Sequence, residues 1–96
     1  MKDMSKKYQV SFVASGRVQG VCFRYFVQTE ALKKNIAGWV KNLPSGDVEG
    51  IMQGTCLSLE NMIEKIKIGN SLARVLHVDV NWDPVVTEYK SFDIHY

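Results

Sequence analysis

The chain changes from a strand pattern to a helical pattern within one stretch, residues 16–24, with the sequence GRVQGVCFR. Gly16 and Gly20 stand four positions apart and allow the backbone to bend tightly and to approach a ligand closely. Consecutive amide N–H groups in such a bend, with a helix N-terminus behind them, can form a cradle for an anion. Arg24 adds a guanidinium group whose planar donors suit phosphate or carboxylate. The stretch predicts a strand–loop–helix unit with a site for a phosphate-sized anion.

Further strands are predicted on both sides of this stretch. Before it, apolar and polar residues alternate with the period of two that is typical of a half-buried strand. A run of turn-forming residues at 42–47, NLPSGD, predicts a hairpin connection between two later strands. Leu76, Val78, Val80 and Trp82 are expected to share one face of the fourth strand. The five predicted strands cover residues 8–14, 36–41, 48–53, 75–82 and 92–96.

Two helices are predicted from apolar stripes with helical spacing. The first runs from about Cys22 to Asn35, with a stripe formed by Phe23, Phe26, Val27 and Ala31. The second runs from about Leu59 to Ile68, where Leu59, Met62, Ile63 and Ile66 follow the spacing i, i+3, i+4 and i+7. Ser58 is the expected N-cap of the second helix, and Gly69 is placed to end it.

The order of these elements predicts the fold class. Strand, helix, strand, strand, helix, strand, with a short terminal strand, is typical of an α+β ferredoxin-like (split βαβ) sandwich. In that fold an antiparallel sheet carries two helices on one face. We expect a single domain over residues 1–96, in which residues 1–7 form a flexible N-terminal segment. The fold does not specify the activity, because unrelated functions use it.

Composition limits the function classes. Ninety-six residues suffice for one modest core, and 46% hydrophobic and 23% charged residues are ordinary for a globular protein. The net charge of +2 is too small to indicate a nucleic-acid partner, but residues 1–42 carry +6 and residues 43–96 carry −4. The basic half can steer an anion towards the glycine stretch. The difference in charge between the halves is explained equally well by two solvated faces that happen to differ in charge.

No segment of the sequence has the features of a signal peptide or a membrane span, so a cytoplasmic protein is expected. Cys22 and Cys56 are too few for a disulfide framework or a zinc site, and each is expected to be a reduced thiol. His77 and His95 alternate with apolar strand residues and are expected to face solvent. No metal-ligand spacing, catalytic carboxylate pair or Ser-His-Asp set stands out.

Three residues are candidates for chemistry, each with a plainer alternative. Arg24, taken alone, is an ordinary surface arginine, but its place after the glycine bend favours anion binding. Asn42 fits a turn residue of the hairpin, or an amide that holds a water near the cradle. Cys22 lies at a helix N-terminus, which lowers a thiol pKa, but packing explains it better than nucleophilic catalysis. The glycine spacing matches neither a Walker A loop nor the dinucleotide fingerprint, so a small phosphate is a better candidate than a nucleotide.

On two motifs the chain resembles the acylphosphatase family. The first is the stretch 16–24, and the second is residues 38–48, GWVKNLPSGDV, followed by Gly54. The segment 71–75, SLARV, and the alternation of Phe92, Ile94 and Tyr96 are also similar to family features. The resemblance covers residues 8–96 and implies the same ferredoxin-like sandwich. His95 departs from it, because many relatives carry arginine at that position.

The resemblance implies a hydrolase that converts a small acyl phosphate into a carboxylate and inorganic phosphate. It assigns phosphate binding to Arg24 and to the loop residues Gly16, Arg17, Val18, Gln19, Gly20, Val21 and Cys22. It assigns the orientation of the attacking water to Asn42. Because the carboxylate of an acyl phosphate is a good leaving group, neither a metal nor a covalent nucleophile is required, and no cofactor is expected. The chain is expected to act as a monomer, without nucleic-acid or membrane partners.

Two alternatives to this enzyme remain. RNA recognition motifs share the strand order and bind bases on aromatic residues of the central strands. The first strand here carries Tyr8 and Phe12, but the predicted third strand has no aromatic residue, which argues against RNA binding. The second alternative is an acylphosphatase-like module that binds an anion without turning it over.

Overall fold

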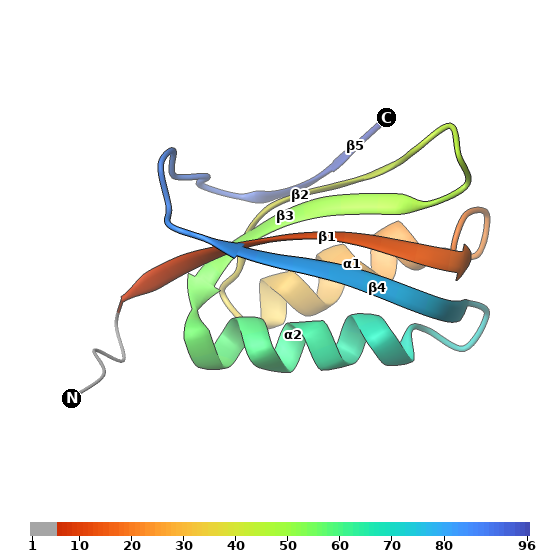
Figure 1. The fold of residues 1–96 in the computed structure, drawn as a ribbon, viewed down its shortest axis with the longest axis horizontal. Helices are drawn as coiled ribbons and strands as arrows, with labels where there is room; N and C mark the ends of the chain where they lie inside the picture. Colours follow the sequence, from red (N-terminus) through yellow and green to blue (C-terminus); the bar gives the residue numbers. More distant parts are fainter. Residues whose placement is uncertain (1–5) are drawn as a thin grey trace.

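The computed structural model describes residues 6–96 as a sheet with two helices (Figure 1). The predicted flexible segment, residues 1–7, lies largely outside the described residues, and its last residue, Lys7, is the first residue of β1. The elements are β1 Lys7–Arg17, α1 Phe23–Lys33, β2 Ala37–Asn42, β3 Val48–Thr55, α2 Cys56–Ile68, β4 Arg74–Asp83 and β5 Phe92–His95.

The five strands form one sheet in the order β4-β1-β3-β2-β5, and both helices cover the same face (Figure 1). We call the other face the open face. The predicted ferredoxin-like α+β class is confirmed. The pairs β1–β4, β1–β3 and β2–β3 are antiparallel, whereas β5 pairs with β2 in parallel. The connection after β4 carries the chain to the opposite edge of the sheet. There β5 has the direction opposite to that of β4, which is the direction of β2, so β5 and β2 are parallel.

The core lies between the helices and the sheet. Val10, Phe12 and Ala14 of β1 are all buried, so the alternation predicted for that strand is confirmed. The predicted stripe of α2 is confirmed as well, because its four apolar residues are buried against the sheet. Phe12 therefore faces the helices and is not available to stack on a base from the open face. The other buried apolar residues are Val18, Val21, Phe23, Val27, Ala31, Ile36, Val40, Val48, Met52 and Phe92.

A β-bulge changes which side of β4 faces the core. Ser15 of β1 pairs with His77, but the next residue, Gly16, pairs with Val75, so that Leu76 has no partner. Val75 packs against the core, and the Leu76 side chain is 71% exposed. The prediction that Leu76 shares a face with the apolar residues after it is wrong, because the extra residue of a bulge reverses the alternation.

Both helices differ from the predicted ones at their N-termini. Helix α2 begins at Cys56, three residues earlier than predicted, and Thr55 rather than Ser58 is its N-cap. The Thr55 hydroxyl oxygen accepts a hydrogen bond of 3.3 Å from the backbone N–H of Ser58, which satisfies one of the free donors of the first turn. Helix α1 begins at Phe23, because Cys22 has a φ of 63° in the left-handed region and stands outside the helix.

A buried carboxylate joins the two helices and was not predicted. Glu30 of α1 is only 7% exposed and forms ion pairs with Lys33 at 3.3 Å, Lys34 at 3.7 Å and Lys65 of α2 at 3.7 Å. Burial of the carboxyl raises its pKa. The hydrogen bond from Lys33 and the charges of Lys34 and Lys65 lower the pKa of Glu30 and outweigh burial, so the pKa lies below its usual value. The helical stripe alone does not reveal this contact, because Lys65 lies on another helix.

Candidate active site

The loop between β1 and α1 is held in place from two sides. The Gln19 side chain donates hydrogen bonds to the carbonyl oxygens of Leu43, at 2.7 Å, and Asp47, at 2.8 Å, in the β2–β3 connection. On the other side the Asn70 side chain donates a bond of 2.7 Å to the carbonyl oxygen of Val21. Val21 is itself part of the core. These contacts fix the loop on the folded body, so its backbone groups have defined directions.

The backbone of this loop presents donors that no carbonyl uses. Gly20 and Cys22 both have positive φ values, 73° and 63°. Left-handed residues among right-handed ones make consecutive N–H groups converge on one point. Within residues 6–96, none of the backbone N–H groups of residues 18–22 donates a hydrogen bond to a backbone carbonyl. The loop is therefore able to offer these donors to an anion.

Arg24 lies in the first turn of α1 and points towards the end of β5. Its Nη1 donates a hydrogen bond of 3.1 Å to the carbonyl oxygen of His95, and its guanidinium carbon lies 4.8 Å from the centre of the Tyr96 ring. The ion pairs of the described residues do not include Arg24. Its positive charge is thus held in a defined position without being neutralised by a carboxylate.

Asn42 ends β2 and shares a cavity of about 350 Å³ with Arg24. Its Oδ1 atom is buried and accepts no hydrogen bond from another described residue. A buried acceptor without a partner is costly, and such an acceptor commonly binds a water or a ligand. The cavity therefore combines a cation, loop donors and a buried acceptor. Its lining residues are Val18, Gly20, Cys22, Phe23, Arg24, Tyr25, Asn42, Ile94 and Tyr96.

The structure brings together some of the residues assigned to the site from the sequence. Val18, Gly20, Cys22, Arg24 and Asn42 line the cavity. The remaining four residues of the assigned loop have other surroundings, and Gly16 and Arg17 belong to β1 rather than to the loop. Gly16 forms the bulge with β4, Arg17 pairs with Arg74, Gln19 tethers the loop, and Val21 is buried.

No sequence pattern indicates that β5 contributes to the cavity. Ile94 and Tyr96 line it, and His95 provides a carbonyl to Arg24. Their alternation predicts a strand, but not that this strand is next to β2 and beside the start of α1. Tyr25, which is adjacent to Arg24 in the sequence, was also missed.

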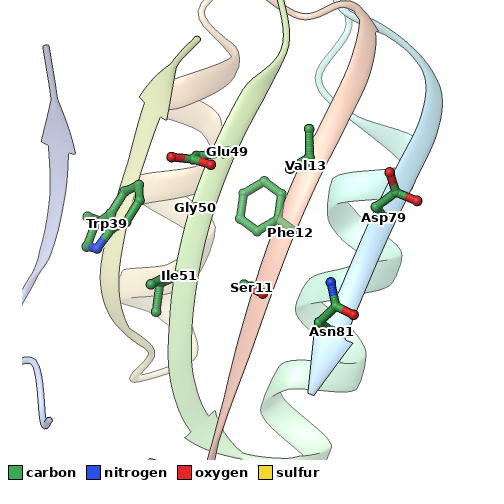
Figure 2. Close-up of a pocket in the computed structure, with 9 residues that line it drawn as sticks. All are labelled: Ser11, Phe12, Val13, Trp39, Glu49, Gly50, Ile51, Asp79 and Asn81. Carbon is green, nitrogen blue, oxygen red and sulfur yellow. The ribbon is translucent and has the colours of Figure 1, made fainter. Parts of the chain in front are cut away.

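A second cavity, of about 280 Å³, lies on the open face and contains none of the assigned residues (Figure 2). It is lined by neutral and acidic side chains, among them Trp39, Glu49, Asp79 and Asn81. Asp79 lies 2.8 Å from the exposed ring of His77, and Glu49 forms an ion pair of 3.5 Å with Lys41. Carboxylates repel an anion, so we place the candidate site in the cavity that contains Arg24.

Other features of the described residues are simpler. Residues 6–96 contain no group of three or more His, Cys, Asp or Glu side chains placed to hold a metal ion. None of the helices in this part of the chain is long and apolar enough to cross a bilayer. His95 is exposed and stacks on Trp39, with ring centres 5.2 Å apart. Cys22 is exposed, lines the cavity and is not bridged to Cys56.

Comparison with known proteins identifies one family over nearly the whole chain. The family model described as Acylphosphatase matches residues 10–94. An acylphosphatase from Clostridium beijerinckii is 44% identical over 86 residues, which are 90% of this chain and 96% of that protein. The crystal structure of acylphosphatase from Bacillus subtilis superposes with a TM-score of 0.90 at 39% identity and covers 93% of this chain and 99% of its own. An acylphosphatase from Coxiella burnetii superposes with a TM-score of 0.88 at 34% identity and 94% coverage of each chain.

Proposed function

This chain belongs to the acylphosphatase family and is accordingly a hydrolase acting on acyl phosphates; we propose that Arg24 and the loop amides hold the phosphoryl group while Asn42 orients the attacking water. One observation carries this assignment of roles. Three loop residues with free backbone donors line one cavity together with Arg24 and with Asn42, whose Oδ1 is a buried acceptor without a partner among the described residues; the three are Val18, Gly20 and Cys22.

The donors would stabilise negative charge on the phosphoryl oxygens. Arg24 has five N–H donors, of which the His95 carbonyl uses one, so two parallel donors can still face a phosphoryl group. The backbone amides of Val18, Gly20 and Cys22, which line the same cavity, would contact the other phosphoryl oxygens. Because these donors are already oriented, they stabilise the transition state without reorganising during the reaction. Gly16 and Arg17 would contribute by shaping the entry to the loop.

Asn42 would position the nucleophile. Its Oδ1 can accept a hydrogen bond from a water, whose oxygen then attacks phosphorus in line with the departing carboxylate. The new P–O bond forms as the bond between phosphorus and the acyl oxygen breaks, and the carboxylate leaves with that electron pair. An amide is not a base at neutral pH, and the described residues that line the cavity include no Asp, Glu or His side chain. We therefore propose that a phosphoryl oxygen of the substrate takes the proton of the water.

The reaction, on this proposal, needs no metal or cofactor, because the leaving carboxylate is stable without one. The substrate is a small-molecule acyl phosphate, and inorganic phosphate is a product that competes for the same donors. A monomer acting in the cytoplasm, with no nucleic-acid or membrane partner, remains our proposal for the protein in the cell.

The decisive experiment is hydrolysis of benzoyl phosphate by the purified protein in the presence of a metal chelator. We expect turnover that survives chelation and that inorganic phosphate inhibits competitively. The absence of a base from the cavity lining also suits a module that binds phosphate without turnover. A folded sample that binds phosphate but does not hydrolyse the substrate would establish that alternative. A pH–rate profile that requires an enzyme base would refute proton transfer to the substrate.

A further inference from the structure

We propose that Trp39 and His95, which stack on the open face of the sheet, position the guanidinium of Arg24 on the opposite side. This inference rests on the proposed function, since it concerns the arginine that would hold the phosphoryl group. Trp39 and His95 do not line the cavity that contains Arg24. They are positioning residues, which act through the backbone at the end of β5.

The stack is a contact between two neighbouring strands. Trp39 of β2 pairs with Asp93 of β5, and Lys41 of β2 pairs with His95, so Trp39 and His95 are diagonal neighbours on one face. Their ring planes are inclined by only 13°, with the centres 5.2 Å apart. Trp39 precedes the buried Val40 and therefore points to the open face, as Figure 2 shows. Diagonal neighbours of this kind lie within reach of aromatic side chains.

The stack holds the C-terminal end of an edge strand, beyond its buried residue Phe92. β5 spans only four residues and pairs with a single neighbour, β2. A short edge strand of this kind frays unless side chains anchor it. On the core side β5 is anchored by Phe92, which belongs to the buried cluster, and by Ile94, which packs against that cluster. On the open side the His95 ring, resting on Trp39, is the corresponding anchor.

The anchored backbone in turn contacts Arg24 twice. The carbonyl oxygen of His95 accepts the bond of 3.1 Å from Nη1, and the next residue, Tyr96, places its ring 4.8 Å from the guanidinium carbon. Among residues 6–96 these are the contacts that hold the charged group of Arg24. If the end of β5 moves, both contacts move with it, and the guanidinium loses its fixed direction. Orientation of a donor matters because a misplaced group stabilises the transition state poorly.

The test uses Trp39→Ala and His95→Ala, with His95→Phe as the variant that keeps a ring for stacking. The Arg24 Nε–Hε signal in a ¹H–¹⁵N spectrum reports the order of the guanidinium directly, with or without activity. Titration calorimetry with inorganic phosphate reports its binding. We expect both alanine variants to shift or broaden the Arg24 signal and to weaken phosphate binding by roughly two- to tenfold. His95→Phe should keep the wild-type Arg24 signal and the wild-type affinity for phosphate.

A double-mutant cycle separates positioning from a general loss of structure. In an Arg24→Ala background, Trp39→Ala should not weaken phosphate binding further, because residues that act through one another are non-additive. Trp82→Ala and His77→Ala are matched controls: both residues are exposed on β4, away from the cavity. Tyr89→Phe removes only the hydrogen bond of 3.3 Å from Trp39 Nε1 and should leave the Arg24 signal unchanged.

The possible results distinguish this inference from the proposed function. If phosphate binds the wild-type protein and binds the folded alanine variants equally well, with the Arg24 signal unchanged, the positioning role is wrong. If the wild-type protein binds no phosphate, the proposed function fails. In that case the positioning role is tested separately by the Arg24 signal, and a signal that does not change in His95→Ala would overturn it. If Trp39→Ala does not fold, the comparison of His95→Ala with His95→Phe still tests the positioning role, because the His95 side chain is exposed.

Discussion

Replacing Arg24 with alanine removes the one cationic side chain among the described residues that line the candidate cavity. The guanidinium is held by the His95 carbonyl and the Tyr96 ring, and two of its remaining donors can face one phosphoryl group. A charge-assisted hydrogen bond contributes about 1.5–3 kcal/mol, so two would contribute about 3–6 kcal/mol. Because Arg24 is partly exposed to solvent, which screens its charge, a loss below most of that range, roughly 2–4 kcal/mol, is the better expectation.

This free energy corresponds to a loss of about 30- to 1,000-fold in kcat/KM. The assay is hydrolysis of an acyl phosphate at several concentrations, together with competitive inhibition by inorganic phosphate. Inhibition should weaken too, because the product meets the same donors. The matched control is Arg74→Ala, which removes an exposed arginine at the start of β4 and should retain wild-type kinetics. Equal phosphate inhibition in the wild type and in Arg24→Ala would refute the assignment.

Three other predictions test separate parts of the structure. Asn42→Ala should lower kcat by about 100-fold with little change in phosphate affinity, and near-normal turnover would leave Asn42 as a turn residue. Urea unfolding should show that Gly16→Ala lowers the free energy of unfolding by at least about 2 kcal/mol, because a Cβ at this position overlaps the Arg74 carbonyl oxygen. Gly20→Ala should lower it by only about 1 kcal/mol, because the space around Gly20 is open. Glu30→Gln should cost on the order of 1 kcal/mol at neutral pH.

The cost of Glu30→Gln should depend on pH in a defined direction. The folded pKa of Glu30 lies below its usual value, so the charged carboxylate stabilises the folded state at higher pH, and this stabilisation is lost as the pH falls through the folded pKa. Melting temperatures of the two proteins should therefore converge on acidification. A difference that stays constant from neutral to strongly acidic pH would show that the three lysines do not act through the charge of Glu30.

Much of the fold was predictable because its signals are local. The period of two in β1 and the stripe of α2 depend only on which residues alternate, and the buried residues follow them. The strand–loop–helix unit around Gly20 was predictable for the same reason, since turn and helix-start residues act on their own neighbourhood. The errors at the starts of α1 and α2 are small, because a helix end is set by the cap that satisfies its first donors, and several residues here could act as caps.

The roles inferred for Arg24 and Asn42 rested on sequence motifs, but their meeting in one cavity depends on long-range contacts. Asn42 reaches the loop because β2 lies in the sheet beside the start of α1, and Gln19 ties the loop to the β2–β3 connection. No local sequence pattern predicts that β5 pairs with β2 at the edge of the sheet opposite β4. The His95 carbonyl and the Tyr96 ring could therefore not be placed near Arg24 from the sequence.

The order of strands and helices, their apolar faces and the place of a glycine loop next to an arginine could be predicted from the chain, because each depends on residues within a few positions of one another. Three other features arise from contacts between distant segments: Leu76 is exposed, Glu30 forms an ion pair with Lys65, and the His95 carbonyl of β5 accepts a hydrogen bond from Arg24. These outcomes depend on strand order, on register and on a one-residue bulge, where the free energy of packing between distant segments overrides the local preference.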